Sequence, residues 1–388
     1  MTRIDNAGRR DFLRSAGSVG ASLMMPGLLA ACADDSAPTP WPDWPLEQKI
    51  AQMLIVGFRG TTLAADNPIV RDIEAYRIGG VILFDYDVTL KQYGRNITDP
   101  AQLQDLTRAL QNIARTPMFI AVDQEGGRVV RLKERYGFPA TVSAQSLGTA
   151  DDLGLTGQAA YSIASTLITN GLNLNFAPVV DVNVNPQNPV IGALERSFSG
   201  DPAVVIRHAS EFARTQRRTG VMSALKHFPG HGSSTGDSHQ GFVDVTNTWT
   251  AMELQPFGSL IASDLADMVM TAHIYNANLD PDYPATLSHA TITGVLREKL
   301  GHTGVVVTDD MQMGAISQLY SFPTAVIRSI NAGVDIVLVG NNLAYEPDVV
   351  PRILDIVVNA VARGDIDRAR IDESCGRVMA LKSRYGLA

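Results

Sequence analysis

The chain has 388 residues, a formal net charge of -8 and 45% hydrophobic residues, which fits one large α/β barrel or two ordinary domains. The acidic balance, without dense Lys/Arg stripes, excludes a nucleic-acid partner. Outside the N-terminus no apolar run reaches the roughly 18 residues that a membrane span needs.

The first residues predict an export signal with a lipid anchor. Arg9-Arg10 precedes a modest apolar stretch at 16–31, which ends in Leu29-Ala30-Ala31-Cys32. This pattern resembles a twin-arginine signal with a lipoprotein box. We therefore expect residues 1–31 to be a signal peptide, Cys32 to be lipidated, and 32–45 to be a tether that holds the protein to a membrane of the cell envelope. The alternative is an ordinary signal peptide with an incidental cysteine.

From residue 46 onward, short apolar runs alternate with amphipathic segments, as in βα units with a parallel sheet. Strands are predicted at 53–57, 80–84, 118–123, 174–182, 222–227, 268–273, 304–309 and 335–340. Helices are predicted at 101–114, 155–170, 203–219, 290–300, 322–332 and 372–387. Eight strands favour a single (β/α)8 TIM-type barrel over 46–388. An open doubly wound sheet is disfavoured, because no dinucleotide fingerprint or P-loop is present.

Barrel enzymes place their chemistry at the carboxyl ends of the strands, so polar residues that end predicted strands are candidates. They are Asp123, Asp181, Lys226, His227, His273 and Asp309. The same strand ends in two carboxylates, Asp309 and Asp310, and alternation allows only one of them to act as a nucleophile. Either carboxylate could instead cap the helix that follows.

The segment 226–239 carries the second group of candidates, in a loop rich in Gly, Ser and His. Asp237 can accept the ring N–H of His239 and raise its basicity, which makes the pair a proton shuttle. A zinc site at His227 and His231 is disfavoured, because Pro229 and Gly230 break the helix that their spacing needs. A serine-hydrolase elbow does not fit the spacing around Ser238. Plain loop residues are the third alternative.

Four motifs together resemble glycoside hydrolase family 3, and within it the bacterial β-N-acetylglucosaminidases. They are AVDQEGGRVVR at 121–131, KHFPGHG at 226–232, DSH at 237–239 and TDD at 308–310. They occur in the family's order, and the resemblance covers about residues 50–388. The family's second α/β sandwich domain, which supplies a carboxylate in other branches, is not expected here.

The resemblance implies a role for each matching residue. Asp309 would be the nucleophile of a retaining, exo-acting hydrolase, and His239, paired with Asp237, its acid/base. The terminal sugar would be bound by Asp123, Arg131, Arg196, Lys226 and His227. Arg196 stands in the stretch ERSF at 195–198, which resembles the family's Arg-Ser-Phe segment. The partner would be a glycan that contains N-acetylglucosamine, no metal or organic cofactor is implied, and we expect a monomer.

Three points stay open at this level. Phosphate could replace water, because a histidine base does not repel an anion, and the enzyme would then be a phosphorylase. A catalytically silent, lipid-anchored glycan-binding protein is the alternative outside enzymes, although retention of the nucleophile and the dyad counts against it. Peptidoglycan fragments are the first choice of substrate, and chitin oligosaccharides the second.

Overall fold

The computed structural model describes residues 41–387, whose main feature is an eight-stranded parallel sheet. Its order is β10-β1-β2-β5-β6-β7-β8-β9. The strands are β1 (Leu54–Gly57), β2 (Gly80–Ile82), β5 (Phe119–Val122), β6 (Leu174–Asn175), β7 (Met222–Phe228), β8 (Met268–Thr271), β9 (Val305–Val307) and β10 (Val337–Val339). A parallel bridge between Val307 and Ile336 joins the two edges. The sheet therefore closes, which confirms the predicted TIM-type barrel.

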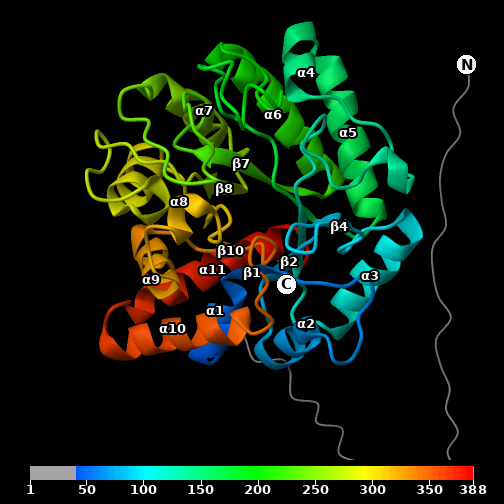
Figure 1. Ribbon diagram of the computed structural model, residues 1–388, viewed down its shortest axis with the longest axis vertical. Coiled ribbons are helices and arrows are strands. Elements are labelled where there is room, and N and C mark those ends of the chain that lie inside the picture. Colours follow the sequence, from blue (N-terminus) through cyan, green and yellow to red (C-terminus); the bar gives the residue numbers. More distant parts are fainter. Residues whose placement is uncertain (1–40, 388) are drawn as a thin grey trace, which may run out of the picture. The chain divides into compact units, whose positions relative to one another are not determined.

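A helical segment follows each strand and covers the outside of the barrel (Figure 1). In chain order these are α2 (Pro68–Arg71), α3 (Pro100–Ile113), α5 (Leu153–Thr169), α6 (Pro202–Thr219), α7 (Gln255–Ala262), η6 (Ala290–Lys299), α9 (Phe322–Ala332) and α10 (Val349–Arg363). Shorter pieces are η1 (Trp41–Asp43), η2 (Asp72–Tyr76), η3 (Glu134–Tyr136), α4 (Ala144–Ala150), η4 (Ala251–Leu254), η5 (Ala285–Leu287) and α8 (Gly314–Ser317). The described residues contain no second α/β sandwich domain.

Alternation along the strands divides the core into two shells. In β5, Phe119 and Ala121 point into the barrel, whereas Ile120 and Val122 pack in the outer shell against the helices. In β9, Val305 and Val307 face inward in the same way. The strands are buried on both sides, and this explains why they read as continuous apolar runs.

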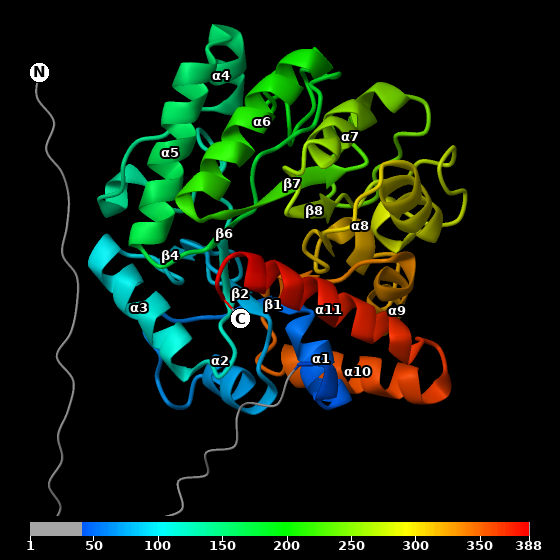
Figure 2. The same cartoon turned by 180° about the vertical axis from the view of Figure 1, so that it is seen from behind.

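Two helices close the end of the barrel where the strands begin. Helix α1 (Leu46–Gln52) precedes β1 and packs against α11 (Arg368–Arg384). Figure 2 shows α11 crossing in front of β1 and β2. Val378 and Leu381 of α11 join the inner core, so this end is sealed by apolar side chains. The opposite end carries the polar residues that follow the strands.

The observed elements differ from the predicted ones in a few places. The fourth strand was predicted at 174–182, but the ladder of β6 ends at Asn175. Helix α10 was not predicted, nor was the small antiparallel hairpin of β3 (Tyr86–Asp87) and β4 (Gln92–Tyr93). Trp44, assigned to the tether, is buried against Cys375 and Met379 of α11. The folded structure therefore includes the last residues of the stretch 32–45.

The predicted signal peptide and the anchor residue Cys32 lie outside the described residues. Among residues 41–387, no helix is long and apolar enough to cross a membrane.

Candidate active site

A pocket of about 390 Å³ opens at the carboxyl ends of the barrel strands. Inward-facing residues of the strands, Ile82, Met270 and Leu338, form part of its apolar lining. Its polar lining includes five residues that the sequence analysis discussed, namely Asp123, Arg131, His239, Asp309 and Asp310. These come from segments after β5, β7 and β9. We call this cavity the barrel pocket.

Asp309 lies two residues beyond β9, and its Oδ1 accepts the backbone N–H of Asp310 at 2.8 Å. Burial opposes ionisation of this carboxyl group. The charges of His227, His273 and His239 outweigh burial and lower the pKa of Asp309 to about 2. Asp309 is therefore ionised at neutral pH, as a nucleophile or an electrostatic stabiliser must be.

Asp310 is bound in a different way. Its Oδ1 accepts backbone N–H groups from Gly340 at 3.0 Å and from Gln312 at 3.1 Å. Burial raises the pKa of Asp310 to about 6, although these two bonds act against the shift. Asp310 therefore connects the segment after β9 to the segment after β10, and it is the structural member of the pair.

His239 and Asp237 lie in the loop that follows β7, the fifth strand of the barrel. Nδ1 of His239 is 2.8 Å from Oδ1 of Asp237, and the same oxygen accepts the backbone N–H of His239 at 2.9 Å. Burial opposes ionisation of Asp237, but these bonds to His239 lower its pKa. The ionised Asp237 accepts the Nδ1 proton, so Nε2 of His239 is free to exchange a proton. About half of the His239 side chain is exposed.

Backbone contacts attach this dyad loop, residues 230–240, to the segment after β9. Gly314 and Ala315 of α8 donate N–H groups to the carbonyl oxygens of His239 and Ser238, each at 3.1 Å. The hydroxyl oxygen of Ser238 also lies 3.1 Å from Nε2 of His231. The acid/base candidate is therefore held by the segment that carries Asp309.

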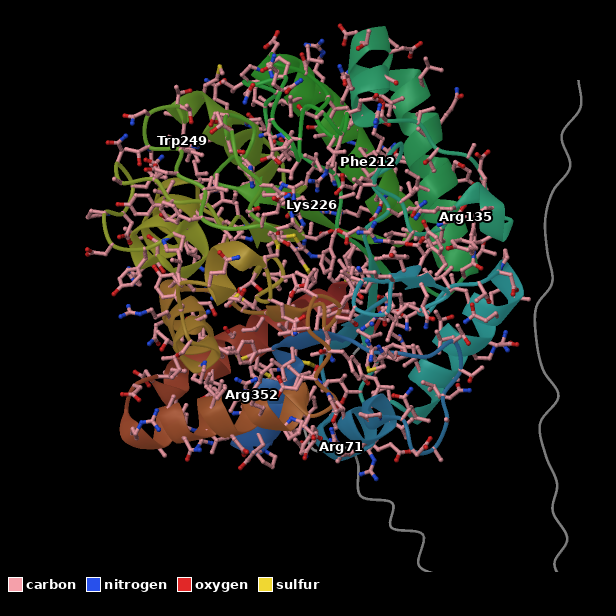
Figure 3. All side chains as sticks on the ribbon, viewed as in Figure 1. Arg71, Arg135, Phe212, Lys226, Trp249 and Arg352 are labelled. Atoms are coloured by element: carbon pink, nitrogen blue, oxygen red, sulfur yellow. The ribbon has the colours of Figure 1, made fainter. Side chains whose placement is uncertain are left out.

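Lys226 and Arg196 belong to a buried network of ion pairs behind Asp123. Nζ of Lys226 is 2.7 Å from both Asp123 Oδ1 and Glu125 Oε1. Arg196 binds both oxygens of Glu125 at 2.8 Å, and Arg131 approaches Asp123 at 3.4 Å. Burial would raise the pKa of Glu125, but Arg196 and Lys226 hold it well below its usual range. Figure 3 shows Lys226 in the middle of the barrel domain.

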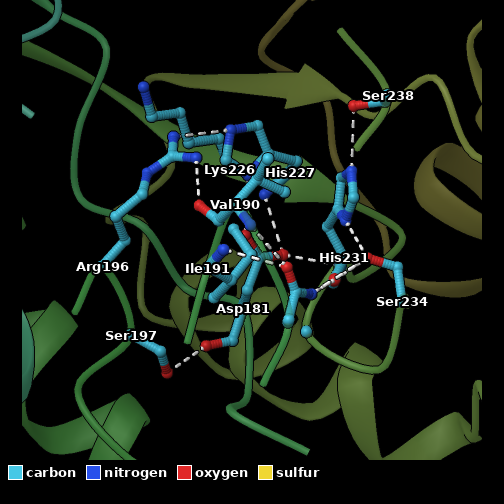
Figure 4. Close-up of polar contacts among 12 residues, drawn as sticks. Asp181, Val190, Ile191, Arg196, Ser197, Lys226, His227, His231, Ser234 and Ser238 are labelled. Atoms are coloured by element: carbon cyan, nitrogen blue, oxygen red, sulfur yellow. Dashed lines mark hydrogen bonds and ion pairs between the residues drawn. The ribbon is translucent and has the colours of Figure 1, made fainter. Parts of the chain in front are cut away.

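His227 is fixed by a carboxylate that lies wholly inside the protein. Its Nδ1 is 2.7 Å from Asp181 Oδ2, and the other oxygen of Asp181 accepts the backbone N–H groups of His227 and His231. Nε2 of His227 lies 3.2 Å from Arg196. Figure 4 shows these contacts, with His231 between Ser234 and Ser238. Among residues 41–387, no cluster of three His, Cys, Asp or Glu side chains is placed to hold a metal ion.

The sequence matches the model of the glycosyl hydrolase family 3 N-terminal domain over residues 45–381. The chain belongs to this family. It is 36% identical over 337 residues to β-hexosaminidase A of Pseudoalteromonas piscicida, covering 80% of this chain and 54% of that protein. It is 35% identical over 336 residues to a β-hexosaminidase of Stenotrophomonas maltophilia, covering 84% of this chain and 91% of the relative.

Among solved structures, a family 3 β-N-acetylglucosaminidase from Paenibacillus is 38% identical and superimposes with a TM-score of 0.81. The match covers 89% of this chain and 63% of the Paenibacillus chain. This chain thus spans about half to two thirds of the length of some family 3 relatives and nearly all of others. These matches confirm the predicted family and the glycoside hydrolase class.

Not all family-predicted sugar-binding residues line the barrel pocket. Asp123 and Arg131 do, whereas Lys226 and His227 are almost fully buried and Arg196 lies in the network behind them. Glu125, which joins Lys226 to Arg196, was not among the predicted site residues. Asp181 was predicted only as a polar residue at the end of a strand. Glu125 lies inside the motif at 121–131 and Asp181 at the end of a predicted strand, which marks both as candidates. Their contacts with buried cationic or histidine side chains appear only in the folded chain.

Proposed function

We propose that this family 3 protein is an exo-acting, retaining β-N-acetylglucosaminidase. One observation carries the proposal: Asp309 and His239 line the same barrel pocket, and Asp237 binds Nδ1 of His239 at 2.8 Å. An ionised carboxylate and a histidine with a carboxylate partner are the two groups that double displacement at an anomeric carbon requires. The names of the family 3 relatives support N-acetylhexosamine as the terminal sugar.

In this mechanism Asp309 attacks the anomeric carbon while Nε2–H of His239 protonates the departing oxygen. The bond to the leaving group breaks, and a glycosyl-aspartate forms. His239, now neutral, then removes a proton from water, which opens the intermediate and restores Asp309. Asp237 stabilises the imidazolium form of His239, and a neutral base adds no second negative charge beside Asp309.

For sugar binding we propose two layers. Asp123 and Arg131 contact hydroxyl groups of the terminal sugar directly, since both line the barrel pocket. Behind them, Nζ of Lys226 binds the Asp123 carboxylate at 2.7 Å. Arg196 is paired with Glu125, and His227 is paired with Asp181. Loss of Lys226 would leave Asp123 and Glu125 without their shared cation.

The test uses the full chain and its Asp309→Ala and His239→Ala variants, with 4-nitrophenyl β-N-acetylglucosaminide as substrate. Asp309→Ala should lose at least about 10⁴-fold in kcat, and His239→Ala about 10²- to 10⁴-fold. Added azide should restore turnover of His239→Ala by forming the β-glycosyl azide, because azide needs no general base. An α-azide, or full activity in Asp309→Ala, would contradict the retaining mechanism.

The same assay separates the alternatives. Acceleration of the wild type by phosphate, with sugar phosphate as product, would identify a phosphorylase. Glycan binding by a folded wild type that turns over no N-acetylglucosaminide would identify a binding protein.

We further propose that the terminal sugar comes from peptidoglycan fragments and that the enzyme is exported and lipid-anchored through Cys32. The support is the Arg9-Arg10 pair and the Leu29–Cys32 box. Labelling with radioactive palmitate should mark the wild type and spare Cys32→Ser, and Arg9→Lys with Arg10→Lys should retain the precursor inside the cell. Equal labelling of Cys32→Ser would disprove the anchor.

A further inference from the structure

The dyad loop begins in a buried stem, residues 230–234, to which the proposed mechanism gives no task. Oε2 of Glu253 in η4 accepts the backbone N–H of Gly232 at 3.0 Å. Oδ1 of Asp181, in the segment after β6, accepts the backbone N–H of His231 at 2.8 Å. Both carboxylates are fully buried, so these contacts fix the stem inside the protein.

The dyad is far less enclosed than the stem. The side chain of His239 is 52% exposed and that of Asp237 is 22% exposed. Three nearby side chains of the same loop are at most 3% exposed, namely His231, Ser234 and Ser238. A half-exposed side chain on a loop rich in Gly and Ser keeps its position only where buried contacts fix the main chain beside it. The connection between stem and dyad therefore decides how well His239 is placed.

The imidazole of His231 makes this connection, as Figure 4 shows. Its Nδ1 lies 2.7 Å from Oγ of Ser234, and its Nε2 lies 3.1 Å from Oγ of Ser238. Ser234 Oγ accepts from the side-chain amide of Asn188 at 2.9 Å and donates to the carbonyl oxygen of His231 at 3.0 Å. The Ser234 proton is thus committed, so Nδ1–H of His231 donates to Ser234 and Nε2 accepts the hydroxyl proton of Ser238. This tautomer gives each of these protons an acceptor.

The bond from Ser238 requires a neutral His231. Burial and the neighbouring His227 lower the pKa of His231 to about 4, although Asp181 acts in the opposite direction. A protonated imidazole would carry N–H groups at both nitrogens and could not accept from Ser238. The buried histidine of the dyad loop therefore stays an acceptor at neutral pH, while the exposed His239 can exchange a proton.

We propose that His231 is a positioning residue for the acid/base His239, because it accepts the hydroxyl hydrogen of Ser238 and so fixes the main chain next to His239. The inference rests on the proposed function and goes beyond its two catalytic groups. Gly314 and Ala315 hold the same stretch from α8 through backbone bonds, and His231 holds it from the stem. His231 acts through Ser238 and not on the sugar.

A 2,4-dinitrophenyl glycoside separates this role from a general loss of folded protein. Its leaving group needs no proton donor, so kcat/KM, which reports formation of the glycosyl-enzyme, does not depend on His239. The second step needs His239 as a base, and a misplaced base makes this step limit kcat. A misplaced His239 therefore lowers kcat and KM together and leaves kcat/KM unchanged. Loss of folded protein lowers kcat and kcat/KM equally and leaves KM unchanged.

The experiment uses the full chain, 2,4-dinitrophenyl β-N-acetylglucosaminide and the variant Ser238→Ala, which removes the hydroxyl and keeps the backbone. Both kcat and KM should fall about 10-fold, and added azide should restore kcat, because azide needs no general base. The matched control is Ser329→Ala in α9. Ser329 is equally buried and donates to the carbonyl oxygen of Val326 at 2.9 Å. The control should keep the wild-type kcat and KM.

A second variant, His231→Leu, removes the acceptor from the other side of the bond. It should give the same parallel fall in kcat and KM, and the double variant with Ser238→Ala should fall no further than either single variant. His239→Ala supplies the reference, with a larger parallel fall. Unchanged kcat in Ser238→Ala, or losses that multiply in the double variant, would overturn the positioning role alone. Absence of the parallel fall in His239→Ala would instead overturn the acid/base assignment of the proposed function.

Discussion

At the residue scale, two adjacent carboxylates have opposite environments. Asp309 is free of backbone donors other than the N–H of Asp310, whereas Asp310 Oδ1 accepts two amides. Asparagine at position 310 would keep the Oδ1 acceptor and its hydrogen bonds from the N–H groups of Gln312 and Gly340. Asp310→Asn should therefore fold normally and retain activity within about tenfold, whereas Asp309→Asn should lose at least about 10⁴-fold.

Thermal unfolding and kcat for both variants test this contrast. Comparable losses of activity in the two variants, at unchanged melting temperature, would mean that Asp310 takes part in the chemistry directly.

The pKa of Asp309 predicts how activity depends on acidity. A carboxyl group with a folded pKa of about 2 stays ionised down to roughly pH 3. Its contribution to stability is present above the unfolded value near 4 and is lost as pH falls through 2. With a 2,4-dinitrophenyl glycoside, which needs no proton donor, kcat/KM should stay constant from pH 6 down to about pH 4. An acidic limb near pH 5 would show that Asp309 titrates there.

Asp309 was a candidate because it ends a β-branched strand, and His239 because Asp237 stands two residues before it; both line the barrel pocket. The sequence did not show which of the predicted sugar-binding residues line the barrel pocket. Asp123 and Lys226 were both predicted to bind sugar; Asp123 lines the barrel pocket, and Lys226, 2% exposed, lies between Asp123 and Glu125. Which charges are buried together depends on how β5 and β7 are placed in the barrel, and no local pattern encodes that.

At the scale of elements, the contact between the dyad loop and α8 should control activity. A Cβ atom at Gly314 would lie 2.8 Å from the backbone C and O of Gln240, too close for any relaxed contact. Gly314→Ala should displace the dyad loop and lower kcat/KM by about tenfold or more, while the core stays intact.

The control is Gly294→Ala in η6, where a Cβ atom would meet nothing within 4 Å. It should leave activity unchanged and keep or slightly raise the melting temperature. Wild-type activity in Gly314→Ala would mean that the dyad loop does not depend on this contact.

The strands were predictable because burial on both sides makes them apolar, as in the Val305–Val307 run of β9. The fourth strand was predicted at 174–182, but its regular ladder ends at Asn175; beyond Pro178, which cannot donate a backbone hydrogen bond, an isolated parallel bridge joins Val179 to Lys226 of β7. Helix α10 was missed although Val349, Ile353, Val357 and Ala360 have helical spacing. The β3–β4 hairpin has strands of only two residues each, and such short strands leave no periodic pattern in the sequence.

At the scale of the whole molecule, α11 seals the barrel with a buried lysine. Lys382 is fully buried, donates to Gln52 at 2.7 Å and lies 4.9 Å from the ring centroid of Phe119. Burial lowers the pKa of Lys382 to about 7. Between pH 7 and the unfolded value near 10.5 the unfolded chain binds more protons, so stability should rise with pH in this window.

Lys382→Met keeps the length of the side chain and removes the charge. It should stabilise the protein by roughly 1 to 3 kcal/mol at pH 7, and the gain should shrink toward pH 10. Thermal unfolding of both proteins at pH 6, 8 and 9.5 measures it. A gain that does not change with pH would assign the effect to packing and not to the buried charge.

The closure of the barrel also sets an order of events during synthesis. Strand β1 pairs with β10, and the strand-start end is sealed by α11, so the first seven strands leave the ribosome with an open seam and an uncovered apolar interior. Inner residues such as Ile55 and Phe119 stay accessible to water until the last helix is made. That late interval is when the nascent chain is most exposed to aggregation and most in need of a chaperone.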